Sequence, residues 1–283
     1  MIVLRKYTVA VLSVVLGVFC LPHGSVSAGT KTTASVGTFG MFVGGYLTAQ
    51  LCCGNSLADV GMFLNELRKN PSEMGALGPC SPYVGRAVVG CIPEKIVGVS
   101  RKFLEVGAGT GAISAQLIRS IEADDTVDLV EMQKPLCEML TKKFCATKKG
   151  AEQVKVHCMP IQQFKSAHKY DSILISVPFL ACPFEVVKDI WEHVLPLLAD
   201  GGTVSYVWHA GLIPVKTKFL EIFNPEKKKE FEKVTNYLDS LNSTYGAKCL
   251  LVKRNVSPLY VRHLKFEKPS ELAGKELVKP AIL

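Results

Sequence analysis

The stretch FLEVGAGTGAISAQLI, residues 103–118, decides the fold. Its apolar run carries an acid, glycine then recurs at Gly107, Gly109 and Gly111, and an amphipathic segment follows. Glycine permits positive φ and lets a ligand approach bare backbone. The amides at the start of the next helix suit an anionic group or a carboxylate. The stretch therefore predicts a strand, a tight ligand-binding loop and a helix.

Strand and helix patterns alternate around this stretch, which is typical of a parallel sheet with helical crossovers. The expected strands are 102–106, 126–131, 154–158, 172–177 and 204–208. The expected helices are 111–121, 134–145, 184–198 and 225–241, with further helices from Leu57 to Leu67 and around 84–91. Segments 248–253 and 259–266 resemble a hairpin at the sheet edge.

Two acidic residues near the glycine loop help to indicate which class of ligand it binds. The glycines with Ala112 also satisfy the dinucleotide pattern, so the loop alone leaves two ligand classes open. Glu105 stands two residues before the first glycine, where it can face an ammonium and would repel a pyrophosphate. Glu131 ends the next strand, where it can accept hydrogen bonds from both hydroxyls of a ribose. Glu131 suits both ligand classes, whereas Glu105 favours a cofactor that carries an amino acid.

The motifs LEVGAGTG, LVEM, YDSILISVPF and LLADGGTVSYVW follow one another between Leu104 and Trp208. In this order they resemble the motif set of class I S-adenosylmethionine-dependent methyltransferases. The resemblance implies an α/β three-layer sandwich with a seven-stranded, mostly parallel sheet, the Rossmann-like methyltransferase fold, preceded by a helical N-terminal arm. It also implies S-adenosyl-L-methionine as the cofactor.

The resemblance further implies a set of cofactor-binding residues. The glycines would line the methionine moiety, Glu131 would hold the ribose and Met132 would lie against the adenine. Where many members carry an acid after the third strand, this chain has Pro160 and Ile161, so either Gln162 or a backbone group is expected to take the place of the acid. The full set is Glu105, Gly107, Ala108, Gly109, Gly111, Glu131, Met132, Gln162 and Ser176.

The fourth strand ends in Ser176-Val177-Pro178-Phe179, which bears on the methyl acceptor. It partly matches the Asn-Leu-Pro-Tyr of ribosomal RNA adenine dimethylases, in which a polar group accepts from an amine and an aromatic ring stacks on the base. Those enzymes add a helical domain after the sheet, and too few residues follow His209 here to form one.

A second resemblance covers Met62 to Pro214. The segments GALGPCSPYVGRAV, ILISVPFLACPFEVV and DGGTVSYVW are similar to bacterial phospholipid N-methyltransferases. This resemblance implies N-methylation of a phospholipid head-group amine, such as that of phosphatidylethanolamine, with an anionic or zwitterionic membrane lipid as partner. The alternative is an RNA adenine or small-molecule N-methyltransferase. The predicted catalytic residues are Ser176, Pro178, Phe179 and Tyr83, and Tyr206 and His209 are further candidates for the base.

Composition sets few limits. The chain of 283 residues is 48% hydrophobic and carries a net charge of +8, which suits a polyanionic partner without specifying one. Its ten cysteines are scattered without zinc-ligand spacing, so no metal site is expected.

Two basic residues precede an apolar run from Tyr7 to Leu21, the pattern of a signal peptide. The other interpretation is an over-extended start, with translation beginning at Met41 or Met62. The first favours an exported, non-catalytic protein that retains the fold. The second favours a cytoplasmic protein at the inner membrane face. The expected divisions are 1–28 (signal-like), 29–56 (linker), 57–267 (methyltransferase domain) and 268–283 (tail).

Overall fold

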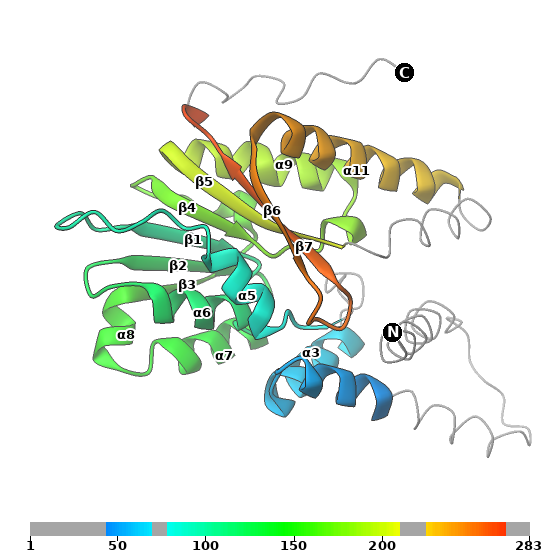
Figure 1. Ribbon diagram of the computed structural model, residues 1–283. Coiled ribbons are helices and arrows are strands. Elements are labelled where there is room, and N and C mark those ends of the chain that lie inside the picture. The colour runs from blue at the N-terminus through cyan, green and yellow to red at the C-terminus, as the bar shows by residue number, and fades with distance from the viewer. Residues whose placement is uncertain (1–43, 70–77, 210–224, 270–283) are drawn as a thin grey trace, which may run out of the picture.

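The sheet that the sequence predicts is present. The computed structural model describes residues 44–69, 78–209 and 225–269 (Figure 1). Seven strands lie in the order β3-β2-β1-β4-β5-β7-β6. Neighbours pair in parallel except β7, which runs antiparallel to both β5 and β6. The predicted fold class, a mostly parallel seven-stranded sheet ending in an antiparallel hairpin, is confirmed.

The described elements have the following bounds. The strands are β1 (Lys102–Val106), β2 (Thr126–Glu131), β3 (Val154–Cys158), β4 (Tyr170–Ile175), β5 (Leu198–His209), β6 (Gly246–Val252) and β7 (Leu259–Lys265). The helices are α3 (Leu57–Lys69), α5 (Pro82–Val89), α6 (Ala112–Ser120), α7 (Lys134–Phe144), α8 (Lys148–Gln153), α9 (Phe184–Val194) and α11 (Pro225–Tyr245). Three short 3₁₀ segments are η1 (Ile161–Gln163), η2 (Phe179–Ala181) and η3 (Leu195–Leu197).

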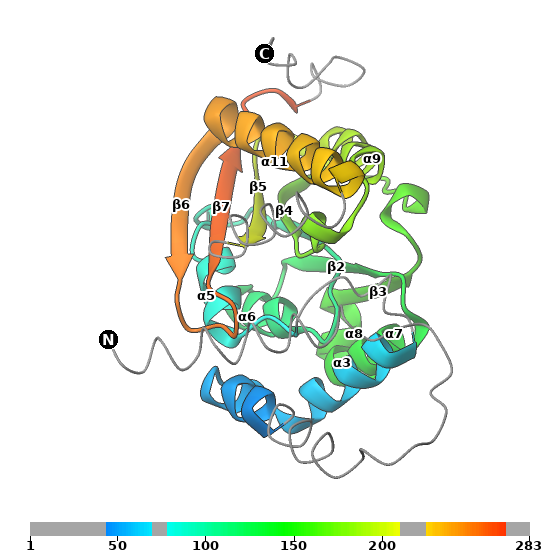
Figure 2. The same cartoon turned by 90° about the vertical axis from the view of Figure 1, so that its right-hand side faces the viewer.

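Helices bury both faces of the sheet and give three layers (Figures 1 and 2). Side chains of α5, α6 and α7 pack with Leu129 and Leu174 on one face. Side chains of α9 and α11 pack with Leu104, Ile175 and Val204 on the other. Since successive side chains of a strand point to opposite faces, the central strands are apolar on both sides.

The position of β1 determines where a ligand can enter. From β1 the chain builds the sheet outward in two directions, through β2 and β3 on one side and through β4 and β5 on the other. The carboxyl end of β1 is therefore a topological switch point, the place where open α/β sheets bind their ligands.

The expected linker over 29–56 is wrong for its second half. Residues 44–52 are helical, with Tyr46, Ala49 and Gln50 buried. The buried amide of Gln50 donates to Tyr46 Oη at 2.8 Å and accepts from Asn55 Nδ2 at 2.6 Å. A buried face built on a glutamine and an alanine gives no apolar periodicity, so the sequence pattern did not reveal it.

Residues 1–43 and 270–283 lie outside the described residues, and with them the signal-like segment and most of the expected tail. No helix in the described part of the chain has both the length and the hydropathy needed to cross a membrane.

A buried ion pair joins the amino ends of β1 and β2. The carboxylate of Asp125 accepts from Arg101 Nη2 at 2.7 Å, from the Arg101 amide at 2.8 Å and from Lys95 Nζ at 2.7 Å. Burial alone would raise the pKa of Asp125, but the hydrogen bonds from Arg101 and Lys95 outweigh it and hold that pKa well below its usual range.

We expect Asp125→Asn to lower the free energy of unfolding by about 3 kcal/mol at pH 7, because it leaves Arg101 buried without its counter-charge. Asp124→Asn is the matched control, since the Asp124 side chain is 49% exposed; its effect should stay within about 0.5 kcal/mol. Urea unfolding followed by circular dichroism measures both. A lowered carboxyl pKa stabilises the fold above the unfolded-state pKa, so the difference between the variants should shrink as the pH falls below about 4.

Candidate active site

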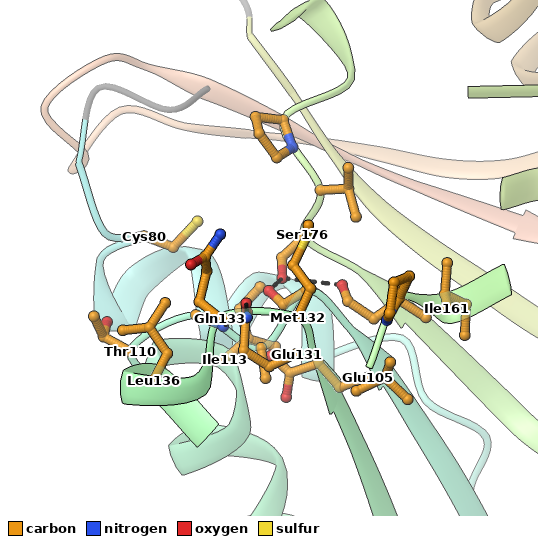
Figure 3. Close-up of a pocket in the computed structure, with 18 of the residues that line it drawn as sticks. Cys80, Glu105, Thr110, Ile113, Glu131, Met132, Gln133, Leu136, Ile161 and Ser176 are labelled. Atoms are coloured by element: carbon orange, nitrogen blue, oxygen red, sulfur yellow. Dashed lines mark hydrogen bonds between the residues drawn. The ribbon is translucent and has the colours of Figure 1, made fainter. Parts of the chain in front are cut away.

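A cavity of about 410 Å³ lies at the carboxyl ends of β1, β2 and β4 (Figure 3). Its wall combines the glycine loop after β1, the end of β2, the segment that runs from Met159 into η1, and the turn Ser176–Pro178. Its size is that of a small-molecule site.

The glycine loop takes a backbone that other residues rarely adopt. The φ angles of Gly107, Gly109 and Gly111 are 76°, 57° and 80°. A Cβ at Gly111 would lie 2.7 Å from Phe144 Cε2, so a side chain cannot fit there. Gly107 and Gly109 line the cavity together with Ala108, whereas Gly111 is not among the lining residues. Gly111 therefore lies behind the cavity wall, where it lets the loop turn against α7.

Glu131 joins the glycine loop to the end of β2. Its Oε2 accepts from the Gly109 amide at 2.8 Å and its Oε1 accepts from the Gln133 amide at 2.9 Å. A carboxylate oxygen has two acceptor positions, so each oxygen keeps one for a further donor. Glu131 and Met132 both line the cavity (Figure 3). This arrangement suits a ribose whose two hydroxyls approach a single carboxylate.

Glu105 is a buried carboxyl group without a counter-charge. Its side chain is fully buried, and among the described residues neither oxygen has a hydrogen-bond partner. Burial raises the pKa of Glu105 to about 8; the nearby Ser114 hydroxyl opposes that rise and the charge of Glu131 adds to it. An unpaired carboxyl group in a cavity wall is costly unless a cation occupies the cavity. The two acceptor groups, Glu105 and Glu131, thus fit a ligand that presents both an ammonium and a ribose.

Ser176 donates its hydroxyl hydrogen to the glycine loop. Its Oγ donates to the carbonyl oxygen of Gly107, and its amide donates to the carbonyl oxygen of Val106 at 3.0 Å. Ser176 and Pro178 both line the cavity. Because the hydroxyl hydrogen is engaged, the oxygen can offer only lone pairs to a ligand.

Gln162 also lines the cavity, from the exposed surface of η1. Pro160 and Ile161 lie beside it, where the sequence departs from the usual acid. This part of the wall is apolar except for the Gln162 amide and backbone groups, which fits the expectation that Gln162 or a backbone group takes the place of the acid.

Phe179 does not lie where the sequence predicts. It is 2% exposed, its ring centroid lies 6.2 Å from that of Trp191 and 6.1 Å from that of Tyr206, and it is absent from the cavity wall. Three aromatic side chains from η2, α9 and β5 bury one another here, which turns Phe179 into the core. A stacking role for its ring is not supported.

Tyr206 and Tyr83, two further candidates for the base, also lie away from the wall. Tyr206 is fully buried, its hydroxyl donates to the Leu238 carbonyl at 3.2 Å, and burial raises its pKa to about 12, which argues against a base. Tyr83 lies outside the lining, stacked with two arginines. The side chain of His209 lies outside the described residues.

Part of the wall comes from the N-terminal region; the sequence allows the helix at 57–67 to pack over the cofactor pocket, but it did not identify the individual wall residues. Phe63 of α3 and the segment Gly78–Cys80 line the cavity. A Cβ at Gly78 would overlap Gln50 Nε2 and Tyr46 Oη, and Asn55 Nδ2 donates to the Pro79 carbonyl at 3.4 Å. The helix at residues 44–52 is therefore packed directly against a wall of the cavity.

No family model matches this chain. The curated ornithine lipid N-methyltransferase of Singulisphaera acidiphila is 25% identical over 154 residues, which is 53% of this chain and 78% of that protein. This similarity agrees with the sheet order, the ordered motifs and the two carboxyl groups in the cavity wall. The chain is a class I S-adenosylmethionine-dependent methyltransferase.

Solved structures of methyltransferases are also similar. N-methyltransferase NodS from Bradyrhizobium japonicum WM9, in complex with S-adenosyl-L-homocysteine, is 11% identical with a TM-score of 0.45, covering 78% of this chain and 97% of that one. TrmN from Thermus thermophilus is 16% identical with a TM-score of 0.46, covering 70% and 52%.

We expect Glu131→Ala to weaken S-adenosylmethionine binding by this methyltransferase about 100-fold, since hydrogen bonds to a charged group are worth about 1.5–3 kcal/mol each. Isothermal titration calorimetry measures the affinity. Glu138→Ala, which removes an exposed carboxylate from α7, is the matched control and should bind as the wild type does. Equal affinities for the two variants would contradict the role given to Glu131.

Glu105 should release a proton when the cofactor binds. At pH 7 a carboxyl group with a pKa of about 8 is mostly protonated, and an adjacent ammonium favours its charged form. Calorimetry in buffers of different ionisation enthalpy should show close to one proton released per cofactor, and Glu105→Gln should show almost none. Equal release by the two proteins would rule the contact out.

The same carboxyl group sets a pH dependence without cofactor. The folded state holds this proton more tightly than the unfolded chain does, so the free energy of unfolding should fall as the pH rises from about 4.5 to about 8. Glu105→Gln should remove that slope, which chemical unfolding at a series of pH values can measure.

Proposed function

We propose that this methyltransferase N-methylates the head-group amine of a zwitterionic membrane lipid. The observation that carries the proposal is Ser176, whose oxygen can only accept and which lines the cavity beside the glycine loop. An amine that must approach the cofactor with an N–H available finds a matching acceptor there. The curated relative's name, ornithine lipid N-methyltransferase, supports a lipid amine.

Several groups would hold the cofactor. Glu131 would accept hydrogen bonds from the ribose, Glu105 would face the ammonium, and the backbone of Gly107 and Gly109 would allow close approach. When bound, S-adenosylmethionine supplies an activated methyl group. The contribution of the chain is to fix the amine in line with that group, and proximity and alignment then account for most of the acceleration.

The acceptor amine must be neutral when it attacks. An ammonium ion loses stability in a desolvated site, so its pKa falls on entry. The apolar wall near the acceptor turn, formed by Val177, Pro178 and Ile190, provides such an environment. The amine therefore loses its proton to solvent as it enters, and Ser176 accepts one of its remaining N–H groups.

The enzyme would work at a membrane surface. Leu51 and Leu57 in the N-terminal helices are 45% and 63% exposed, and the chain is basic overall. Exposed apolar side chains with positive charge give weak, reversible adsorption to an anionic surface. We place this surface on the cytoplasmic face, because S-adenosylmethionine is a cytosolic metabolite.

Two kinds of lipid have the primary amine that the proposed reaction requires. Phosphatidylethanolamine carries a primary amine and a phosphate, and an ornithine lipid carries a primary amine and a carboxylate. The test incubates the purified full-length chain with methyl-labelled S-adenosylmethionine and vesicles that contain one or the other, followed by thin-layer chromatography. Labelled lipid is the expected result. Cofactor binding without labelled lipid from either vesicle would overturn the proposal.

We expect Ser176→Ala to lower kcat/KM for the lipid about 10- to 100-fold, which is the cost of one hydrogen bond to a group that gains charge. Cofactor affinity, measured by calorimetry, should change little and serves as the internal control. A loss of cofactor affinity equal to the loss of turnover would show that Ser176 acts on the loop and not on the amine.

A further inference from the structure

Two arginines share one tyrosine ring at the edge of the cavity. The Cζ atoms of Arg86 and Arg254 lie 4.4 Å and 4.1 Å from the ring centroid of Tyr83. Both arginine side chains are exposed, and within residues 44–69, 78–209 and 225–269 neither forms an ion pair with an acid. Two like charges on one ring repel each other, and the ring quadrupole offsets only part of that repulsion. A shared anion would remove it.

The backbone fixes where Arg254 lies. Ser81, the N-cap of α5, donates from its Oγ to the Arg254 carbonyl at 2.6 Å, and its amide donates to Asn255 Oδ1 at 2.8 Å. The loop between β6 and β7 is therefore tied to the first turn of α5, the helix that carries Tyr83 and Arg86. The two guanidinium groups are consequently brought together by the fold and not by chance contact of long side chains.

This site lies beside the cofactor cavity. Gly78–Cys80, directly before Ser81, forms part of the cavity wall. His209 at the carboxyl end of β5 pairs with Leu259, so the β6–β7 loop lies at the same edge of the sheet as the glycine loop. Both views show this loop next to α5 and the N-terminal helices (Figures 1 and 2).

Exposed apolar side chains adjoin the turn that packs on Tyr83. A Cβ at Gly54 would lie 3.9 Å from Tyr83 Cε2, so the turn at Cys53 and Gly54 packs on the tyrosine. The exposed Leu51 and Leu57 stand on either side of that turn. An anion held here has apolar surface next to it, which suits a lipid head group better than a free soluble anion.

We propose that Arg86 and Arg254, held on the ring of Tyr83, bind the anionic group of the amine lipid while its nitrogen enters the cavity at Ser176. The inference rests on the proposed function and names the anchor of that substrate: a phosphate or a carboxylate, either of which accepts the paired donors of a guanidinium. Tyr83 is then a positioning residue for the two arginines, and neither a catalytic base nor a cavity residue.

The kinetic test uses the full-length chain with the double variant Arg86→Gln/Arg254→Gln. We expect KM for the amine lipid to rise about tenfold or more, since each lost bond to a charged group is worth about 1.4 kcal/mol or more, with kcat and cofactor affinity nearly unchanged. Arg119→Gln is the matched control, an exposed arginine at the far end of α6 without an ion pair among the described residues. An unchanged KM in the double variant, or an equal rise in the control, overturns the proposal.

The lipid in the vesicle determines which anionic group is offered to the arginines. Comparison of phosphatidylethanolamine with ornithine lipid, each in phosphatidylcholine vesicles, shows whether phosphate or carboxylate is the ligand. Vesicles of phosphatidylcholine with phosphatidylglycerol contain an anion without the amine. If the double variant loses only adsorption to these, with KM for the amine lipid unchanged, the arginines serve general membrane attraction and the proposal is overturned.

A binding test separates this site from the proposed function. The chain saturated with S-adenosyl-L-homocysteine is titrated with glycerophosphoethanolamine and followed by NMR line broadening of the ligand. Binding that the double variant loses and Arg119→Gln retains supports the anion site, even if no lipid is methylated and the proposed function fails. No binding by the wild type, or equal binding by the double variant, overturns the anion site.

Discussion

The carboxylate of Glu131 accepts amide hydrogens from two loops, one after β1 and one after β2. This contact fixes the glycine loop against the end of the neighbouring strand and sets the width of the cavity between them. It also leaves free lone pairs on a buried charge, so the site is formed before any ligand arrives. The position of Ser176, which is bonded to the Gly107 carbonyl, follows from it. The Glu131 side chain thus connects the ends of two neighbouring strands, the glycine loop and, through that loop, Ser176.

Three of the five parallel strands could be predicted with their observed bounds. Strands β1, β2 and β3 have the bounds that the sequence indicates, and β1 and β2 are buried, mostly apolar runs that end before a glycine and at an acid. β4 (Tyr170–Ile175) begins and ends two residues before the expected 172–177. β5 begins at Leu198, before the expected Val204, since the strand continues through glycines that usually mark a turn. The short helix α8 was missed because its sequence KKGAEQ has no apolar face.

Some residues of the candidate site could likewise be predicted from the sequence, and others could not. The places of Glu105, Gly107, Gly109 and Glu131 in the cavity wall could be predicted, because each depends only on its position at the end of a single strand. Phe179 could not be placed, because its direction is set by Trp191 and Tyr206, residues remote in sequence. The walls from Phe63 and Gly78–Cys80 depend on how the N-terminal helices pack, and no local pattern encodes that. Tertiary packing, and not local propensity, limits prediction at such positions.

Because the hydroxyl hydrogen of Ser176 is donated to Gly107, this side chain also affects how many methyl groups one lipid receives. An oxygen that can only accept recognises an amine by the hydrogens on its nitrogen, and every transfer replaces one of these with a methyl group. Primary and secondary amines can keep the contact, a tertiary amine cannot, and a quaternary nitrogen has nothing left to donate. If the acceptor lies at Ser176, the hold on the head group weakens as methylation proceeds, so product escape is built into one serine.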